Sequence, residues 1–281
     1  MLRVAVPNKG SLSEQAAQVL REAGYRQRRD GRALILLDPE NDVEFFYLRP
    51  RDIALYVGEG TLDVGITGRD LLLDSGANAG EVMALGFGES TFRFAARAGS
   101  VSSLGDLNGR RVATSYPGLV GGYLAQRGVA AELVRLDGAV ETAVRLGVAD
   151  VIADVVETGR TLKAAGLELF GDPILRSEAV LVRRDGAPAE PAVDVLVRRL
   201  QGVLVARQYV LMDYDVRAEL VEEACGITPG LESPTVSPLR EQGWVAVRAM
   251  VPRKSTNQVM DALYALGARA ILVTGIHACR L

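Results

Sequence analysis

Hydrophobic residues along the first 90 positions form short continuous runs that alternate with helix-spaced stripes. A run of strand length is followed by polar residues and then by apolar residues three and four positions apart, which is typical of strands alternating with amphipathic helices. We expect strands at Leu2–Val6, Leu34–Leu37, Val43–Leu48 and Val64–Thr67, and helices over 11–23 and 50–57. This alternation predicts an α/β unit.

The pattern predicts a second α/β unit further along the chain. We expect strands at Phe92–Ala96, Arg111–Thr114, Ala131–Arg135 and Val151–Val156, and a helix over 118–126. Residues 184–191 are polar and contain proline, as expected for a crossover, and helical periodicity follows over 192–207. We therefore predict two α/β domains, 1–90 and 91–183, with 184–208 returning to the first.

The last 70 residues change character. Strands are expected at Tyr209–Tyr214, near Thr235, at Trp244–Val251 and at Ala268–Thr274, with helices at Val216–Cys225 and Ser255–Leu266. That order is β-α-β-β-α-β, the ferredoxin-like arrangement. The predicted fold class is therefore α/β, with two lobes and a separate C-terminal domain over 209–281.

Composition excludes several classes of protein. The chain has 281 residues, 48% of them hydrophobic, so it can bury a large core. No apolar run approaches the roughly 20 residues that span a bilayer, and the N-terminus enters a strand at once, so we expect a cytoplasmic protein. A net charge of −3 argues against nonspecific nucleic-acid binding. Two cysteines favour free thiols, and a single histidine, His277, excludes a histidine-based triad.

The segment from Glu141 to Leu162 carries the strongest chemical signal. Asp154 and Glu157 lie at the carboxyl end of a predicted buried strand, and Thr158-Gly159-Arg160-Thr161 precede a helix start near Leu162. Ligands of open α/β folds bind at the carboxyl ends of strands, and a helix start offers free N–H groups to an anion. Hydroxyls, a glycine and an arginine suit a phosphate monoester, and Asp154 suits sugar hydroxyls. The residues favour a sugar phosphate, and a threonine-capped helix after an ordinary strand is the alternative.

Other strand ends carry polar groups whose roles the residues alone leave open. Lys9, next to Gly10, is one of only three lysines among 32 cationic residues, and a compact ammonium suits a pyrophosphate; it would otherwise be a solvated lysine. Gly68 lets backbone approach a ligand and Asp70 can accept a hydrogen bond, or the two form a tight turn with a helix cap. Tyr116 can stack on a base or pack internally.

The same segment resembles the signature of the ATP phosphoribosyltransferase family. Ten positions match its spacing: Glu141, Gly147, Ala149, Ile152, Asp154, Val155, Thr158, Gly159, Thr161 and Leu162. The opening strand followed by Pro, Lys and Gly is also similar, with two departures: Asn8 is inserted before Lys9, and Ser11 stands where the family usually has arginine. The last 70 residues resemble the regulatory domain of the long form.

The resemblance implies Mg²⁺-dependent transfer of a phosphoribosyl group from 5-phosphoribosyl diphosphate to N1 of the adenine of ATP, the first step of histidine biosynthesis. Because the chain lacks a P-loop, ATP is expected to be the nucleophile. The implied catalytic residues are Lys9, Arg49 and Arg32. The implied phosphoribosyl diphosphate site is Asp154, Glu157, Thr158, Gly159, Arg160 and Thr161, and the implied ATP site is Gly10, Gly68, Asp70 and Tyr116. Without the resemblance, Arg32 and Arg49 would be assigned to surface salt bridges.

The long form further implies feedback inhibition by histidine at Asp215, Ser233 and Thr235, bound between neighbouring chains of a dimer or hexamer. These side chains otherwise cap helices and turns. Mg²⁺ is expected to be coordinated mainly by substrate phosphates. No nucleic acid or membrane is an expected partner. The competing hypothesis is a noncatalytic sensor with a solute-binding-protein-like fold, which the absence of an export signal and of a helix-turn-helix disfavours.

Overall fold

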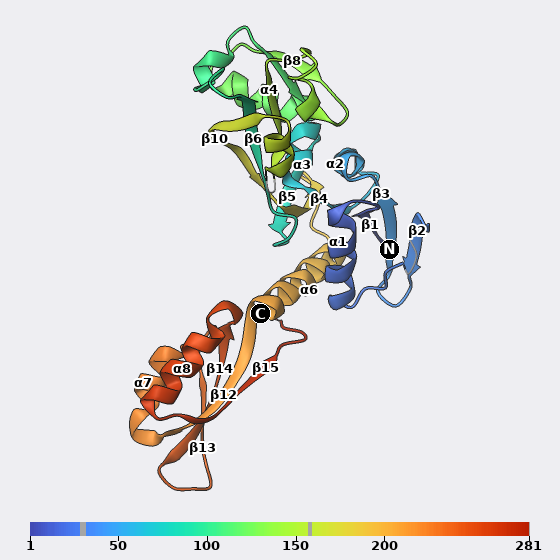
Figure 1. Cartoon of the computed structure of the whole chain (residues 1–281). Helices are drawn as coiled ribbons and strands as arrows, with labels where there is room; N and C mark the ends of the chain where they lie inside the picture. The colour runs from blue at the N-terminus through green and yellow to red at the C-terminus, as the bar shows by residue number, and fades with distance from the viewer. Residues whose placement is uncertain (29–31, 157–158, 281) are drawn as a thin grey trace. The chain divides into compact units, whose positions relative to one another are not determined.

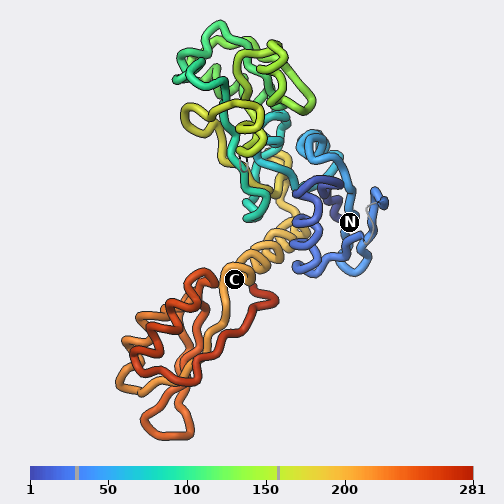
Figure 2. The backbone as a smooth tube through the Cα atoms, viewed as in Figure 1, coloured from blue at the N-terminus to red at the C-terminus, as the bar shows by residue number. Residues whose placement is uncertain are grey.

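The computed structural model describes residues 1–28, 32–156 and 159–280. The described chain divides into two compact units. The first contains Met1–Arg21 and Tyr25–Val193, and the second contains Glu22–Gly24 and the chain from Asp194 onward. Each unit contains its own strands and helices, which Figure 1 draws as a ribbon, and Figure 2 follows the same backbone as a tube.

The first lobe of the first unit is a six-stranded sheet with the order β2-β3-β1-β4-β11-β5. Its strands are β1 (Leu2–Pro7), β2 (Ile35–Asp38), β3 (Val43–Leu48), β4 (Val64–Gly68), β5 (Ala79–Ala84) and β11 (Ala179–Arg184), and its helices are α1 (Ser11–Glu22), α2 (Pro50–Gly58) and α3 (Arg69–Ser75). β1 pairs in parallel with β3 and β4. Apolar side chains of α2, among them Ile53 and Val57, pack on Ala5 and Val180 of the sheet. The four predicted strands of this lobe are confirmed within one or two residues.

The second lobe is a five-stranded sheet with the order β10-β6-β9-β7-β8. Its elements are β6 (Ser90–Arg97), η1 (Leu104–Leu107), β7 (Arg111–Thr114), α4 (Pro117–Gln126), β8 (Glu132–Arg135), η2 (Val140–Thr142), β9 (Val151–Val156), α5 (Arg160–Ala164) and β10 (Leu167–Ser177). β7 lies between β8 and β9 and is parallel to both. The predicted signature strand is confirmed as β9, with Val151, Ile152 and Ala153 buried.

The return of the chain to the first sheet differs from the prediction. Residues 179–183 were assigned to the second domain, but β11 pairs antiparallel with β4 and β5 in the first sheet. The crossover therefore lies at Ser177–Ala179, between β10 and β11, and residues 185–190 instead lead into α6 (Pro191–Gln208). The sequence pattern also missed β5, β10 and β11, because their pairing partners are distant in the chain, and it missed α3, which is only seven residues long.

The second unit contains a four-stranded antiparallel sheet with the order β13-β14-β12-β15. Its elements after α6 are β12 (Tyr209–Arg217), η3 (Ala218–Leu220), α7 (Val221–Ile227), β13 (Thr235–Pro238), β14 (Trp244–Pro252), η4 (Arg253–Ser255), α8 (Thr256–Leu266) and β15 (Arg269–Gly275). The predicted β-α-β-β-α-β order is confirmed. The predicted helix start at Val216 is wrong, because β12 keeps its alternation through Val216, which is fully buried, and α7 begins only at Val221.

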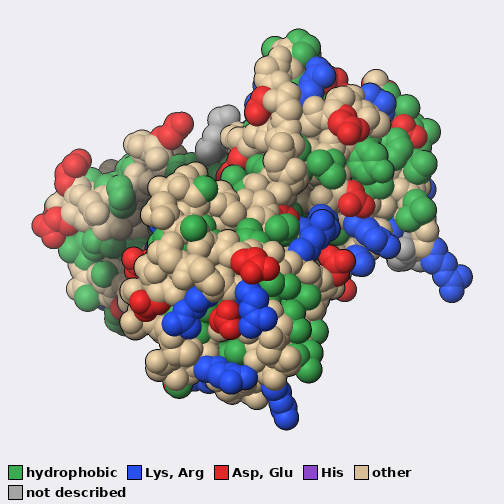
Figure 3. All heavy atoms as spheres, turned by 90° about the horizontal axis from the view of Figure 1, so that it is seen from above, with side chains coloured by type: hydrophobic (Ala, Val, Ile, Leu, Met, Phe, Trp, Pro, Cys, Tyr) green, Lys and Arg blue, Asp and Glu red, His purple; other side chains and the backbone are tan. Residues whose placement is uncertain are grey.

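The predicted α/β fold class is confirmed in both units. Cys225 and Cys279 are free, as expected. In the described ranges, no helix combines the length and apolar character needed to cross a membrane. Acidic and basic side chains are interspersed over the face seen in Figure 3, in keeping with the small net charge of −3.

Candidate active site

A cleft of about 780 Å³ in the first unit collects charged side chains from both lobes. Its lining residues are Lys9, Arg49, Pro50, Arg51, Asp52 and Leu71 from the first lobe, and Ser115, Tyr116, Arg135, Asp137, Gly138, Asp154 and Val155 from the second. The cleft thus brings together four residues with three predicted roles: Lys9 and Arg49 in catalysis, Tyr116 in ATP binding and Asp154 in phosphoribosyl diphosphate binding.

Strand direction explains why these residues meet. Lys9 follows β1 and Arg49 follows β3, and these two strands are parallel neighbours. Tyr116 follows β7, and Asp154 lies near the end of β9, which is parallel to β7. Both sheets therefore present the carboxyl ends of parallel strands to the cleft, the edge at which open α/β sheets bind ligands.

Asp154 is one of two acidic residues, with Asp137, that the second lobe contributes to the wall of the cleft. Its side chain is partly buried, and its Oδ1 accepts the backbone N–H of Val155 at 2.8 Å. Burial raises the pKa of the Asp154 carboxyl, and the nearby charges of Glu141 and Asp70 add to the rise. A carboxylate that is costly to ionise is stabilised by a positively charged or hydroxyl-rich ligand.

Tyr116 occupies the opposite edge of the same wall. Its ring meets Phe92 edge to face, with ring centroids 5.0 Å apart, and the Arg51 guanidinium lies 4.8 Å from the Tyr116 ring centroid. Burial raises the pKa of the Tyr116 phenol, and the nearby negative charge of Asp70 adds to the rise. The phenol is therefore a permanent hydrogen-bond donor at neutral pH.

Asp70 is buried near Tyr116, since its charge helps to raise the pKa of the phenol, and it is absent from the described lining of the cleft. Its Oδ1 accepts the N–H of Leu71 at 2.9 Å and the hydroxyl of Ser177 at 3.0 Å. A Cβ on Gly68 would run into the Asp70 carboxylate, so a larger residue there would displace the Asp70 side chain. Of the four residues predicted to bind ATP, Tyr116 lines the cleft, whereas Gly68 and Asp70 lie outside its described lining.

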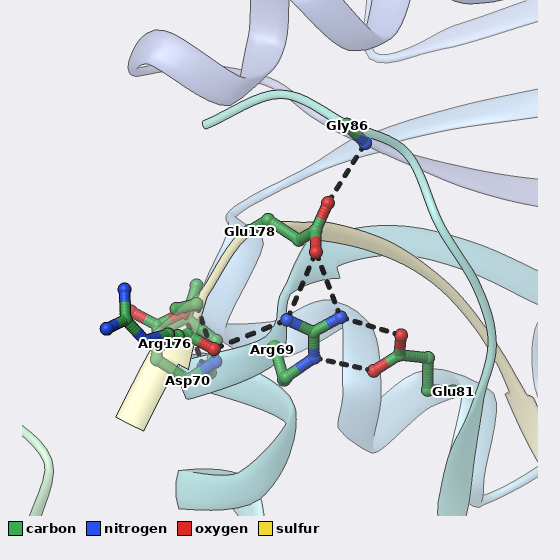
Figure 4. A network of polar contacts seen from close by, with 8 residues as sticks. Arg69, Asp70, Glu81, Gly86, Arg176 and Glu178 are labelled. Atoms are coloured by element: carbon green, nitrogen blue, oxygen red, sulfur yellow. Dashed lines mark hydrogen bonds and ion pairs between the residues drawn. The ribbon is translucent and has the colours of Figure 1, made fainter. Parts of the chain in front are cut away.

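The start of α3 is fixed to the crossover between the lobes, as Figure 4 shows. Arg69 forms ion pairs with Glu81 (2.8 Å) and Glu178 (3.2 Å), and its backbone N–H donates to the Glu178 carbonyl at 3.0 Å. The hydrogen bond to Glu81 is the main reason why the pKa of Arg69 is raised, and the same bond lowers the pKa of Glu81. The Asp70 N–H donates to the Ser177 hydroxyl at 3.0 Å.

The remaining predicted residues lie outside the described lining of this cleft. Gly10 (φ +79°) and Arg32 are exposed. Gly159 adopts a left-handed conformation (φ +68°) and precedes α5, whose first residues, Arg160 and Thr161, are exposed. Gly159 lines a second cavity of about 670 Å³ that Lys163 also lines. Glu157 and Thr158 lie outside the described residues.

Sequence reasoning missed several residues of the cleft. Arg51 and Asp52 were visible as a charged pair after a predicted strand but received no role. Arg135 is the last residue of β8 and Asp137 follows the strand, so charged residues at the end of a predicted strand were the available signal. Among the residues that the structure describes, no group of three or more His, Cys, Asp or Glu side chains is placed to hold a metal ion.

The second unit carries the residues predicted to bind an effector. Asp215 lies on β12, opposite Ala246 of β14. Thr235 lies on β13, opposite Arg248 of β14, and Arg248 in turn lies opposite Asp213 of β12. Cross-strand partners share a face, so these side chains lie on the face opposite the buried Met212, Tyr214 and Val247. Ser233 is exposed in the loop before β13. On this face Arg248 of β14 forms an ion pair of 2.6 Å with Asp213 of β12.

Fold and site together define a two-lobed α/β protein whose strand ends build a polar cleft, suited to anionic ligands with hydroxyl groups. The sequence model of the ATP phosphoribosyltransferase family matches residues 49–202, and the model of the HisG C-terminal domain matches residues 206–278. The chain belongs to the ATP phosphoribosyltransferase family.

Individual relatives agree with this assignment. Proteins named ATP phosphoribosyltransferase from Pseudarthrobacter chlorophenolicus and Streptomyces coelicolor are 71% and 65% identical to the chain, and each alignment covers 100% of both proteins. A solved ATP phosphoribosyl transferase (HisG:HisZ) complex from Thermotoga maritima matches with a TM-score of 0.63 and 28% identity, covering 73% of this chain and 98% of that one.

Proposed function

We propose that this chain is an ATP phosphoribosyltransferase that joins N1 of the adenine of ATP to C1 of 5-phosphoribosyl diphosphate and releases pyrophosphate, as the first step of histidine biosynthesis. The observation that carries the proposal is the single cleft lined by Lys9, Arg49, Tyr116 and Asp154, in a chain of this family. The lone pair of N1 forms the new bond to C1, and the electron pair of the broken C1–O bond leaves with pyrophosphate.

Catalysis then rests on alignment and charge stabilisation. Lys9 and Arg49, which extend from the first lobe, neutralise the diphosphate as it leaves. Asp154 holds the ribose hydroxyls and faces the positive charge that develops on the ring. Tyr116 borders the adenine. Gly159, Arg160 and Thr161, with Glu157 and Thr158, bind the 5-phosphate.

Mg²⁺ fits the donor chemistry of the cleft. Asp52, Asp137 and Asp154 supply the carboxylate oxygens that this ion prefers, and Mg²⁺ is commonly held through phosphates with one or two protein carboxylates. When bound, the ion would neutralise charge on the diphosphate. The protein's own contribution is to orient the two reactants and to exclude water between the lobes.

The decisive experiment mixes the full chain with ATP, phosphoribosyl diphosphate and Mg²⁺ and follows pyrophosphate. We expect release that requires both substrates. Asp154→Asn should abolish it, whereas Asp106→Asn, at an exposed turn of the second lobe, should not. If both substrates bind but no pyrophosphate appears, the proposal is wrong and the noncatalytic sensor is favoured.

We further propose that the second unit binds histidine and that the protein forms dimers and hexamers. Supporting the first point, Asp215 and Thr235 share the sheet face that α7 and α8 leave open. The Asp215 carboxylate suits the ammonium or imidazolium of histidine, and Ser233 and Thr235 suit its polar groups. Asp215→Asn should weaken inhibition by histidine without changing basal turnover, and Asp261→Asn on α8 is the matched control. Unchanged inhibition in the Asp215 variant would contradict the assignment.

A further inference from the structure

The helix α4 of the second lobe begins without a cap of its own. Its N-cap residue is Tyr116, whose side chain makes no capping hydrogen bond, and Pro117 occupies the first position. The free N–H groups of Gly118 and Leu119 instead donate to Oδ1 of Asp74, at 2.9 Å and 3.1 Å. Asp74 belongs to α3 of the first lobe, so the cap joins the two lobes.

The second oxygen of Asp74 holds an arginine of the cleft. Arg51 Nη1 lies 2.6 Å from Asp74 Oδ2, and the same guanidinium lies over the ring of Tyr116. The Asp74 side chain is only 7% exposed, so this contact is largely shielded from solvent. One carboxylate thus orients both the helix that begins after Tyr116 and the cation that lies over the Tyr116 ring.

The position of Asp74 is itself fixed. A Cβ on Gly118 would run into the Asp74 carbonyl oxygen, so α3 and α4 approach as closely as glycine allows. The other end of α3 is held by the Arg69 ion pairs and by the hydrogen bonds between Asp70 and Ser177. Because α3 is held at both ends, the geometry of Asp74 carries over directly to Tyr116 and Arg51.

We infer that Asp74 is a positioning residue for the nucleotide substrate: it docks α4 onto α3 across the lobes and thereby sets Tyr116 and Arg51 at the edge of the cleft. The inference deepens the proposed function, on which it rests. Asp74 contacts no reacting atom itself. Its removal leaves two helix N–H groups unpaired and frees Arg51 to turn toward other anions in the cleft.

The test compares two carboxylates that cap helix starts. In Asp74→Ala we expect the KM for ATP to rise by about tenfold or more, as for the loss of charge-assisted hydrogen bonds, and the KM for phosphoribosyl diphosphate to stay within about twofold. Asp106→Ala is the matched control, because Asp106 Oδ2 also accepts two backbone N–H groups, those of Ser102 and Ser103, but within one lobe. Both KM values of the control should match the parent.

A purely structural role for Asp74 predicts a different result. It would lower the active fraction, and hence the apparent turnover, with both KM values unchanged, and that outcome would overturn the inference, as would equal rises in both KM values. Pyrophosphate release by the parent chain tests the proposed function separately, so the two failures are distinguishable.

Two further variants keep the test decisive if Asp74→Ala does not fold. Asp74→Asn retains an acceptor for Gly118 and Leu119 but loses the charge that holds Arg51, so its KM for ATP should lie between those of the parent and the alanine variant. If Arg51 and Asp74 act as one unit, the double variant Arg51→Met, Asp74→Asn should have a KM for ATP no higher than that of the more impaired of the two single variants. Additive losses, or an asparagine variant identical to the parent, would refute the coupling.

Discussion

Removing the hydroxyl of Tyr116 should separate the two contributions of this side chain. Tyr116→Phe keeps the edge-to-face contact with Phe92 and the ring beneath Arg51, but it removes a buried hydroxyl close to the negative charge of Asp70. Asp70 still accepts from Leu71 and Ser177, so the carboxylate is not left unpaired. The free energy of unfolding should therefore fall by about 1 kcal/mol, the usual net contribution of a single polar group that forms a hydrogen bond.

The pH dependence of that loss gives the sharper test. Because burial raises the pKa of the Tyr116 phenol above its value in the unfolded chain, the folded state binds the phenol proton more tightly than the unfolded state does. Below the ordinary tyrosine pKa of about 10 the phenol is protonated in both states, and the full stabilisation is present. As the pH rises further, the unfolded chain ionises while the folded chain does not, so the parent loses stability and its advantage over the variant shrinks.

Urea unfolding of parent and variant between neutral pH and about pH 11 measures this difference, and Tyr47→Phe serves as a comparison at another buried phenol whose pKa is raised by burial. Kinetics complete the test: the KM for ATP should rise by less than about tenfold, because the ring remains in place. A stability difference that does not change with pH would refute the argument, since it would mean that the phenol is not shielded by burial and Asp70.

Three other predictions concern the cleft and the phosphate loop. Thr161→Ala should raise the KM for phosphoribosyl diphosphate by about tenfold or more and leave the KM for ATP unchanged, because it removes one charge-assisted hydrogen bond to the 5-phosphate; equal losses for both substrates would contradict the loop assignment. Lys9→Met should lower turnover with little change in ATP affinity, and unchanged turnover would remove Lys9 from the mechanism. Asp154→Asn should abolish turnover yet unfold at a higher temperature than the parent at pH 7, because the raised pKa of Asp154 makes its ionised form destabilising. This gain in unfolding temperature should vanish as the pH falls to the ordinary aspartate range, where the parent carboxyl is protonated, and thermal melts at several pH values measure it.

Local patterns identified β9 and the C-terminal order of elements. Val151, Ile152 and Ala153 form a continuous apolar run that is buried in the sheet, whereas β12 alternates between buried and open positions, and both patterns are typical of strands. The end of β12 was placed too early, because Asp215 and Arg217 lie on the open face and read as the start of a polar turn.

Non-local pairing explains what the pattern missed. β11 enters the first sheet between β4 and β5, more than 90 residues away in the chain, and no local signal distinguishes that sheet from the second one. β10 is interrupted by a register shift between Phe170 and Leu175, where Gly171, Asp172 and Pro173 break the apolar pattern. Strand propensity depends on cross-strand neighbours, and those are supplied only by the folded chain.

The sequence by itself determined the chemistry of this protein: a ten-position signature, the polar groups at successive strand ends, and a C-terminal unit of ferredoxin-like order. This was possible because strand ends and helix starts are local features, so the residue types that suit anions there can be recognised within a single segment of sequence. Only the tertiary structure decided that Lys9, Arg49, Tyr116 and Asp154 line one cleft, that the buried Asp70 accepts a hydrogen bond from Ser177, and that Asp74 caps a helix 44 residues further along the chain. Those relations depend on how two sheets pack around their crossovers, and a contact between distant segments leaves no periodic trace in the sequence of either.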